Sequence, residues 1–183
     1  TLLKIRGFKQ NQFKKLHPGG SIGKDLVKLS DIMHVNKKLP LVKYNEKMSD
    51  VFLNQFKIEL DYFLGIKSTS ANSLIGKIII ELEPVITDFK PDLLLCVGDV
   101  NSTLAAAICA NKLDVKLGHI ESGLRSLDRE MPEEINRVLT DEMSDICFVT
   151  EKSGIQNLKK IGKSDTQIAF VGNTMIDTLV HFN

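Results

Sequence analysis

A chain of 183 residues, 43% of them apolar, has room for one domain or for one small domain with an appendage. Its formal net charge of +1 argues against nucleic acid and anionic membranes as partners, because no strong positive field would attract them. No apolar run approaches the ~20 residues of a membrane helix. The start, TLLKIRGFKQ, has neither an apolar signal core nor an initiator methionine, so we expect a partial chain.

The predicted elements change character near residue 50. Residues 1–50 are basic, rich in turns and poorly periodic, with a short strand candidate in LPLV and an HPGG turn. Beyond them, apolar runs alternate with segments of helical periodicity. In chain order we expect helices at 72–89, 101–113, 132–143, 152–162 and 174–182, separated by strands at 91–99, 115–122, 145–151 and 166–173.

These strands are almost continuously apolar, which is typical of a parallel sheet that is buried on both faces. Strands that alternate with helices predict a doubly wound, Rossmann-like α/β domain with helices on both faces of the sheet. We expect the first fifty residues to form an irregular N-terminal appendage, because they bury too little apolar surface for a core of their own.

The three cysteines, Cys96, Cys109 and Cys147, stand in apolar surroundings without CxxC spacing. An odd number of cysteines without a disulfide framework indicates reduced, buried thiols in a cytoplasmic protein. A buried structural cysteine is more common than a reactive one, so we expect no nucleophile among them.

Ionisable side chains gather where two predicted strands end. Asp99 ends one strand, His119 and Glu121 end the next, and Glu133 and Glu134 open the helix that follows. Ligands of open parallel sheets bind outside the carboxyl ends of the strands, so these groups should face one crevice. Neighbouring, partly desolvated carboxylates have pKa values that are driven apart, which allows one to act as a base and another as an acid.

Two of these residues also have structural interpretations. Asp99 can close its turn and help Asn101 to cap the next helix. Glu121 can form an ion pair with Arg125 or Arg129.

The other charged residues can be structural as well. Glu133 and Glu134 lie in the first turn of a helix, where the helix dipole favours acids by roughly 0.3–1 kcal/mol. His119 can be a hydrogen-bonded histidine, and Arg125 and Arg137 can bind phosphate or form ion pairs. Because all of them fall at one functional edge of the sheet, the site interpretation is favoured over the structural one.

Other kinds of site lack their motifs. The sequence has no GxxxxGK[ST] phosphate loop, no GxGxxG after a strand, no GxSxG elbow and no HExxH or Cys/His cluster for zinc. Aromatic residues make up only 6% of the chain and tryptophan is absent, so base stacking has little to work with.

Three stretches, CVGDVNSTLAAAICANKL, GHIESGLRSLDREMPEEINRVLTDEMSD and FVGNTMIDTL, closely resemble the non-hydrolysing UDP-N-acetylglucosamine 2-epimerases. The resemblance covers about residues 51–183. It implies an incomplete N-terminal domain of a GT-B enzyme, in which two Rossmann-like domains enclose the active site. It also implies the interconversion of UDP-GlcNAc and UDP-ManNAc for cell-surface polysaccharide synthesis, by removal of the C2 proton, loss of UDP and its re-addition.

The resemblance also implies roles for individual residues. Asp99, Glu121 and Glu133 match the family's acidic catalytic residues, with base and acid not assigned among them. The positions expected to bind substrate are His119, Arg125, Arg137 and Asn101. No metal and no nicotinamide cofactor is implied.

Some features of the family are not found. There is no Gly-Thr-Arg-Pro-Glu type loop, the stretch 67–70 reads KSTS in place of GSGS, and no nucleotide-binding second domain follows residue 183. We therefore expect little or no activity from this chain alone. An uncovered apolar sheet edge would favour a homodimer.

Residues 1–50 resemble a different family. The stretch RGFKQNQFKKLHPGGSIGKDLVKLSDIMHVNKKLPLV is similar to the end of an arabinose-5-phosphate isomerase domain and the start of its CBS region. His17 matches that family's catalytic histidine, although its other catalytic groups would lie upstream. A fusion of two gene fragments, joined near residue 50, is therefore expected.

Three alternatives to an epimerase remain open. The chain can be an isomerase remnant, a non-catalytic α/β interaction module, or a glycosyltransferase of the same fold. The PEEINR motif speaks against the last of these.

Overall fold

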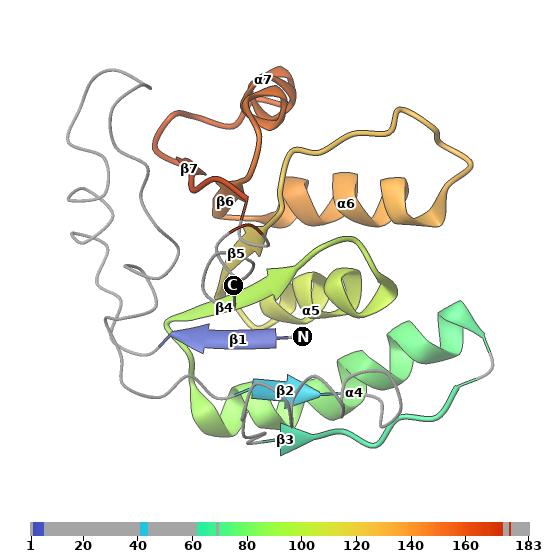
Figure 1. Cartoon of the computed structure of the whole chain (residues 1–183). Helices are drawn as coiled ribbons and strands as arrows, with labels where there is room; N and C mark the ends of the chain where they lie inside the picture. The colour runs from blue at the N-terminus through green and yellow to red at the C-terminus, as the bar shows by residue number, and fades with distance from the viewer. Residues whose placement is uncertain (1, 6–40, 44–61, 69, 174–175, 177–183) are drawn as a thin grey trace.

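The computed structural model describes residues 2–5, 41–43, 62–68, 70–173 and 176. Within these residues, seven strands form one sheet in the order β3-β2-β1-β4-β5-β6-β7 (Figure 1). Its parallel part consists of β4 (Leu93–Val97), β5 (Lys116–Ile120), β6 (Ile146–Val149) and β7 (Ile168–Phe170). The strands expected at 91–99, 115–122, 145–151 and 166–173 are thereby confirmed, as is the α/β fold with a parallel sheet.

The other edge of the sheet contains strands from the N-terminal part of the chain. β1 (Leu2–Ile5) lies antiparallel between β4 and β2 (Leu41–Lys43), and β2 is parallel to β3 (Tyr62–Phe63). The strand expected in LPLV overlaps β2. Sequence analysis missed β1, so the expectation of an irregular N-terminal appendage was wrong for residues 2–5, which take part in the sheet.

Four helices are described in full: α4 (Ala71–Phe89), α5 (Asn101–Lys112), α6 (Pro132–Met143) and α7 (Lys152–Lys160). α5 packs between α4 and α6 on one side of the sheet (Figure 1). All four were predicted within a few residues. The helix expected at 174–182 lies outside the described residues except for Ile176. None of the helices described here is long and apolar enough to span a membrane.

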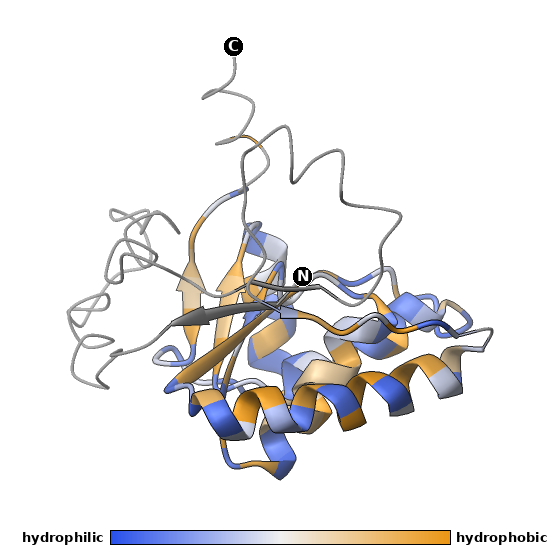
Figure 2. Cartoon of the chain, turned by 90° about the horizontal axis from the view of Figure 1, so that it is seen from below, coloured by the Kyte–Doolittle hydropathy of each residue, from blue (hydrophilic) through white to orange (hydrophobic). Residues whose placement is uncertain are grey.

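Small residues let the helices approach the sheet closely. In α5, Ala105, Ala106 and Ala107 are fully buried, and the strands beneath them appear as apolar, orange ribbons in Figure 2. A Cβ atom at Gly118 of β5 would come within 2.5 Å of Leu95 Cδ2 and 3.0 Å of Phe148 Cε2. Gly118 faces these side chains on the side of the sheet away from α5, and a side chain in its place would require Leu95 or Phe148 to move.

The cysteines belong to this core, as predicted. All three are free and buried. Burial raises the pKa of Cys147 to about 12, helped by the negative charge of Asp141. Burial, with the charge of Glu83, raises the pKa of Cys109 to about 11, and burial raises that of Cys96 further still.

We expect these thiols to be unreactive in the folded protein. The thiolate is the nucleophile, and both burial and the raised pKa suppress it. In a colorimetric thiol assay at pH 8, native protein should react about 10³-fold more slowly than protein in urea, because reaction requires opening of the core. Rapid reaction of even one thiol in the native protein would contradict the expectation.

Candidate active site

Two tight turns at the ends of β4 and β5 carry the proposed catalytic carboxylates. β4 is followed by Gly98, with φ +72°, directly before Asp99, and β5 is followed by Glu121, which itself has φ +69°. A positive φ is costly for a residue with a side chain, so the surrounding structure must hold Glu121 in place. A Cβ atom at Gly98 would lie 3.7 Å from Glu121 Oε2, which places this carboxylate against the turn that carries Asp99.

Glu121 is half-buried. The side chains described here offer its carboxylate no hydrogen bond and no ion pair, so the pairing with Arg125 or Arg129 considered from the sequence is not formed. Its two oxygens are thus not engaged by their described neighbours. A carboxylate in this situation can accept a proton from a ligand without first breaking an internal interaction.

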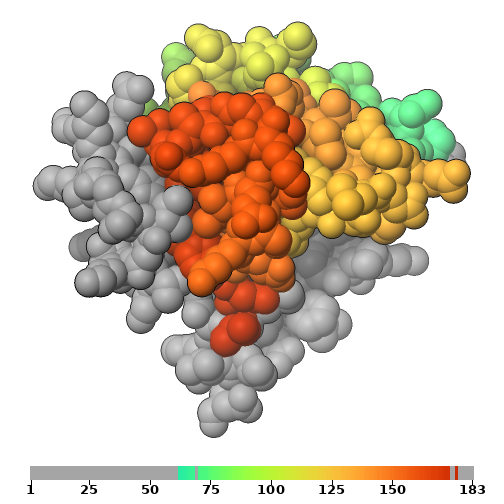
Figure 3. All heavy atoms as spheres, turned by 90° about the horizontal axis from the view of Figure 1, so that it is seen from above, coloured from blue at the N-terminus to red at the C-terminus, as the bar shows by residue number. Residues whose placement is uncertain are grey.

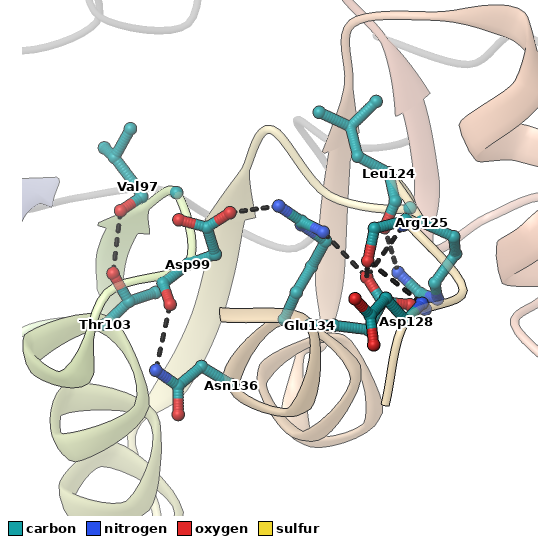
Figure 4. A network of polar contacts seen from close by, with 12 residues as sticks. Val97, Asp99, Thr103, Leu124, Arg125, Asp128, Glu134 and Asn136 are labelled. Atoms are coloured by element: carbon teal, nitrogen blue, oxygen red, sulfur yellow. Dashed lines mark hydrogen bonds and ion pairs between the residues drawn. The ribbon is translucent and has the colours of Figure 1, made fainter. Parts of the chain in front are cut away.

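Asp99 is held from α6 (Figure 4). Its carboxylate forms an ion pair with Arg137 Nη2, and its backbone carbonyl accepts a hydrogen bond from Asn136 Nδ2 at 3.0 Å. Asn136 Nδ2 also donates to Asn101 Oδ1 at 3.1 Å. The side chains of α6 therefore fix both the backbone and the carboxylate of Asp99, and they join Asn101 to the same network.

Glu134 completes this network on its other side. Its Oε2 accepts hydrogen bonds from Arg137 Nη1 at 2.8 Å and from the backbone N and Oγ of Ser126 at 2.9 and 3.1 Å. Burial alone would raise the pKa of Glu134, which is 2% exposed. The hydrogen bonds from Ser126 and Leu127 and the charge of Arg137 outweigh that effect and hold its pKa below the ordinary 4.5.

The structure distinguishes Glu134 from Glu133, which the sequence could not do. Glu133 is exposed in the first turn of α6, whereas Glu134 is buried and is linked to Asp99 by Arg137. The prediction grouped Glu133 with the strand-end acids. In the structure it is Glu134 that is linked to Asp99, through Arg137. A catalytic role of Glu133 stays a proposal.

Acidification is expected to destabilise the wild-type chain more than the Glu134→Gln variant. Because the pKa is lowered by folding, the ionised carboxylate contributes stability above its unfolded-state pKa of 4.5, and this stability is lost as the pH falls through the folded-state value. Denaturant unfolding at pH 7 and at pH 3 measures how much free energy of unfolding the wild-type chain and the Glu134→Gln variant each lose on acidification. Ser126→Ala, which removes one lowering hydrogen bond, should fall between them, and equal losses in all three proteins would contradict this account.

His119 and Arg125 are engaged inside the protein by a third acid of α6. His119 is 0% exposed, with Nδ1 2.7 Å from Asp141 Oδ1 and Nε2 2.8 Å from the carbonyl oxygen of Gly98. Arg125 Nη1 donates to Asp141 Oδ2 at 2.6 Å. The prediction that these two residues bind substrate directly is not supported by this geometry. Arg125 Nη2 is buried and has no hydrogen-bond partner among the described residues.

The loop 121–131 is also anchored by α7 (Figure 3). A Cβ atom at Gly123 would lie 2.5 Å from the carbonyl oxygen of Gly154, so the two backbones are in direct contact. Asn157 Nδ2 donates to the carbonyl of Gly123 at 3.0 Å. The loop is therefore fixed between α6 and α7.

Sequence analysis named Glu133, Glu134 and Arg137 of α6 but missed Asn136 and Asp141. Glu134, Asn136 and Asp141 are buried although they are polar, and they contact the turns that carry the other site residues. A signal existed in the spacing, since Glu134, Arg137 and Asp141 recur at i, i+3 and i+7 and so share one face of a helix. In the part of the chain that the structure describes, no group of His, Cys, Asp and Glu could hold a metal ion.

The fold is that of a class of enzyme that is known from solved structures. A UDP-GlcNAc 2-epimerase from Methanocaldococcus jannaschii is 36% identical, with a TM-score of 0.77 over 86% of this chain and 45% of that one. A Neisseria meningitidis UDP-GlcNAc 2-epimerase bound to UDP-GlcNAc is 34% identical, with a TM-score of 0.74 over 78% and 40% of the two chains. Both similarities show the same α/β fold.

The family model for UDP-N-acetylglucosamine 2-epimerase matches residues 42–183, so the chain belongs to this family. Among curated relatives, a UDP-N-acetylglucosamine 2-epimerase of Methanococcus maripaludis is 41% identical over 163 residues. A UDP-2,3-diacetamido-2,3-dideoxy-D-glucuronate 2-epimerase of Pseudomonas aeruginosa is 43% identical over 142 residues. The matches cover 85% and 76% of this chain, and only 44% and 40% of those two relatives.

Proposed function

We propose that this chain forms the acid/base half of a UDP-N-acetylglucosamine 2-epimerase, which interconverts UDP-GlcNAc and UDP-ManNAc. Family membership supports this proposal. So do the similar solved structures, which include one bound to UDP-GlcNAc and one in complex with UDP-GlcNAc and UDP.

One observation carries the assignment of chemistry to this chain. The unengaged carboxylate of Glu121 lies against the turn of Asp99, whose own carboxylate is held by Arg137. A C2–H bond of a sugar is weakly acidic, so its cleavage requires a positioned base, and return of the proton to the other face requires an acid. Two neighbouring carboxylates in different environments suit this pair of tasks.

We assign the catalytic roles to Asp99, Glu121 and Glu133, which share proton removal and return. Arg137 and Asn101 are the residues we propose to contact the substrate. Both lie in the network around Asp99, and a guanidinium there can stabilise charge that develops during loss of the diphosphate.

A chimeric enzyme can test this function in a protein of full family length. Residues 62–173 would replace the corresponding segment of the Methanocaldococcus jannaschii enzyme. NMR in D₂O would then follow UDP-ManNAc formation and deuterium incorporation at C2. Both should occur, and a folded chimera without either would overturn the proposal. For the 183-residue chain by itself we expect little or no turnover.

The Pseudomonas aeruginosa relative suggests a second substrate of the same class. It is a 2-epimerase of a UDP-diacetamido-glucuronate, and its identity to this chain is as high as 43%. The same assay with that substrate decides between the two, because the better substrate shows the larger kcat/KM.

Cytoplasmic location and a homodimer belong to the same proposal. The buried free thiols support a reducing compartment. Light scattering on the purified chain tests the dimer, and a clean monomer would contradict it.

The resemblance of residues 1–50 to arabinose-5-phosphate isomerase stays a prediction, as does a domain boundary at residue 50. His17 lies outside the described residues, and the match to the epimerase family begins at residue 42. Isomerisation of arabinose 5-phosphate that is lost in His17→Ala would support the isomerase alternative.

A further inference from the structure

We infer that Asp141 is a positioning residue, which helps to set the location of the Asp99 turn relative to the Glu121 turn through a buried bridge of side chains, beside the backbone hydrogen bond from Gly98 N to the carbonyl of Ile120 at 3.1 Å. The inference rests on the proposed function for its catalytic meaning. Its structural part can be tested on the chain itself, without any activity. Asp141 lies on α6, whereas the two turns end β4 and β5, so the bridge joins three elements.

One end of the bridge reaches the Glu121 turn directly. Asp141 Oδ2 accepts a hydrogen bond from the backbone N of Gly123 at 3.0 Å. Gly123 follows Glu121 by two residues and has φ +79°. Since Glu121 also has a positive φ, this turn needs tertiary contacts to keep its shape, and the carboxylate of Asp141 supplies one of them.

The other end reaches the Asp99 turn through His119. Both ring nitrogens fix the position of the imidazole. Nδ1 is 2.7 Å from Asp141 Oδ1, and Nε2 donates to the carbonyl of Gly98 at 2.8 Å. Gly98 directly precedes Asp99. The path Gly123–Asp141–His119–Gly98 therefore connects the two turns with three hydrogen bonds.

Burial makes this bridge stiff. His119 and Asp141 are both 0% exposed, so water does not offer their polar atoms alternative partners. Hydrogen bonds of a charged group inside a protein are stronger than those between neutral groups. Moving either turn would leave a buried polar atom unpaired, which opposes the movement.

Small displacements of the turns matter for the chemistry. A proton can be transferred only when the carboxylate is within hydrogen-bond reach of it, and a misplacement of about 1 Å can cost about 10²-fold in rate. Substrate affinity depends much less on this spacing. Loss of the bridge should therefore lower kcat and leave KM nearly unchanged, a pattern that general destabilisation would not produce.

Amide NMR spectra of the 183-residue chain test the bridge itself. Asp141→Asn should shift the signals of both turns, including Gly98 and Asp99, which Asp141 does not touch. In a His119→Gln background, Asp141→Asn should still shift the Gly123 signal but no longer those of Gly98 and Asp99. Shifts at Gly98 and Asp99 that persist without His119 would overturn the proposed path.

A second comparison keeps the test decisive if Asp141→Asn fails to fold. The buried Arg125 would then lack its partner, so Arg125→Met with Asp141→Asn is compared with Arg125→Met alone. The shifts at both turns should again appear on loss of Asp141. Their absence would overturn the inference.

Kinetics in the chimeric enzyme test the catalytic meaning. Asp141→Asn should lower kcat by about 10- to 100-fold with KM changed less than about threefold, and His119→Gln combined with it should add little, because both act through one bridge. Asp165→Asn, at an exposed acid after α7, should leave both constants as in wild type. An unchanged kcat, or a rise in KM alone, would overturn the positioning role. An inactive wild-type chimera would count against the proposed function, while the NMR result would still decide the bridge.

Discussion

Glu121→Gln is expected to lower kcat for C2 epimerisation by about 10²- to 10⁴-fold in the chimeric enzyme, which is the range that a positioned acid or base supplies. Glutamine has nearly the shape of glutamate, and it bears the same backbone cost at φ +69°. It cannot accept a proton at neutral pH. Deuterium incorporation at C2 should fall with kcat, because the same carboxylate is proposed to take part in breaking the C–H bond.

The variant has a matched control and a clear contrary result. Glu81→Gln makes the same chemical change on the exposed side of α4 and should keep full activity. The free energy of unfolding should change little in Glu121→Gln, since the described residues offer Glu121 no hydrogen bond or ion pair to lose. Full deuterium incorporation in a folded Glu121→Gln enzyme would show that proton removal belongs to another residue, such as Asp99.

The parallel part of the sheet could be predicted because its determinants are local. Runs such as PDLLLCVGD are apolar on both faces and are bounded by Pro or by Gly-Asp. Each strand can therefore be recognised from about nine consecutive residues. β1 could not be found in this way. Its four residues pair with β4 about ninety positions later in the chain, and no short-range pattern specifies such a partner.

In the candidate site, too, the residues that depend on local sequence could be predicted, and those that depend on distant contacts could not. Asp99 and Glu121 could be proposed from the sequence because their positions at strand ends follow from the chain's alternation of elements. The choice between Glu133 and Glu134 depends on which of two adjacent side chains turns inward, and this is decided by Arg137 and Ser126. Asp141 was missed although it shares a helix face with Glu134 and Arg137, because the contacts that bury it and leave Glu142 exposed come from distant residues such as His119 and Gly123.

His119 illustrates how one residue type supports two interpretations. A histidine at a strand end next to an acid is a plausible substrate ligand as long as only the sequence is considered. With Asp141 on one ring nitrogen and the carbonyl of Gly98 on the other, both polar atoms are used within the protein. The structural interpretation is therefore the better supported one, and His119 affects the site by holding a turn in place.

Asp141→Ala is expected to lower the free energy of unfolding by about 3–5 kcal/mol, as is typical when one partner of a buried charged pair is removed. The side chain of Asp141 is 0% exposed and that of Arg125 only 8%. Without the carboxylate, the guanidinium of Arg125 loses its charged partner, and the imidazole of His119 and the backbone N–H of Gly123 each lose one hydrogen bond. Urea unfolding at pH 7 measures this loss.

Two comparisons separate the buried charge from a general effect of the substitution. Asp165→Ala removes an acid that is 72% exposed and pairs with Lys159, so it should cost at most about 1 kcal/mol. Arg125→Met combined with Asp141→Ala should be more stable than Asp141→Ala alone, because no unpaired guanidinium then remains buried. If Asp141→Ala cost no more than Asp165→Ala, the carboxylate of Asp141 could not be the group that holds α6 to the loop 121–131, and the network around it would have to be stable without its charge.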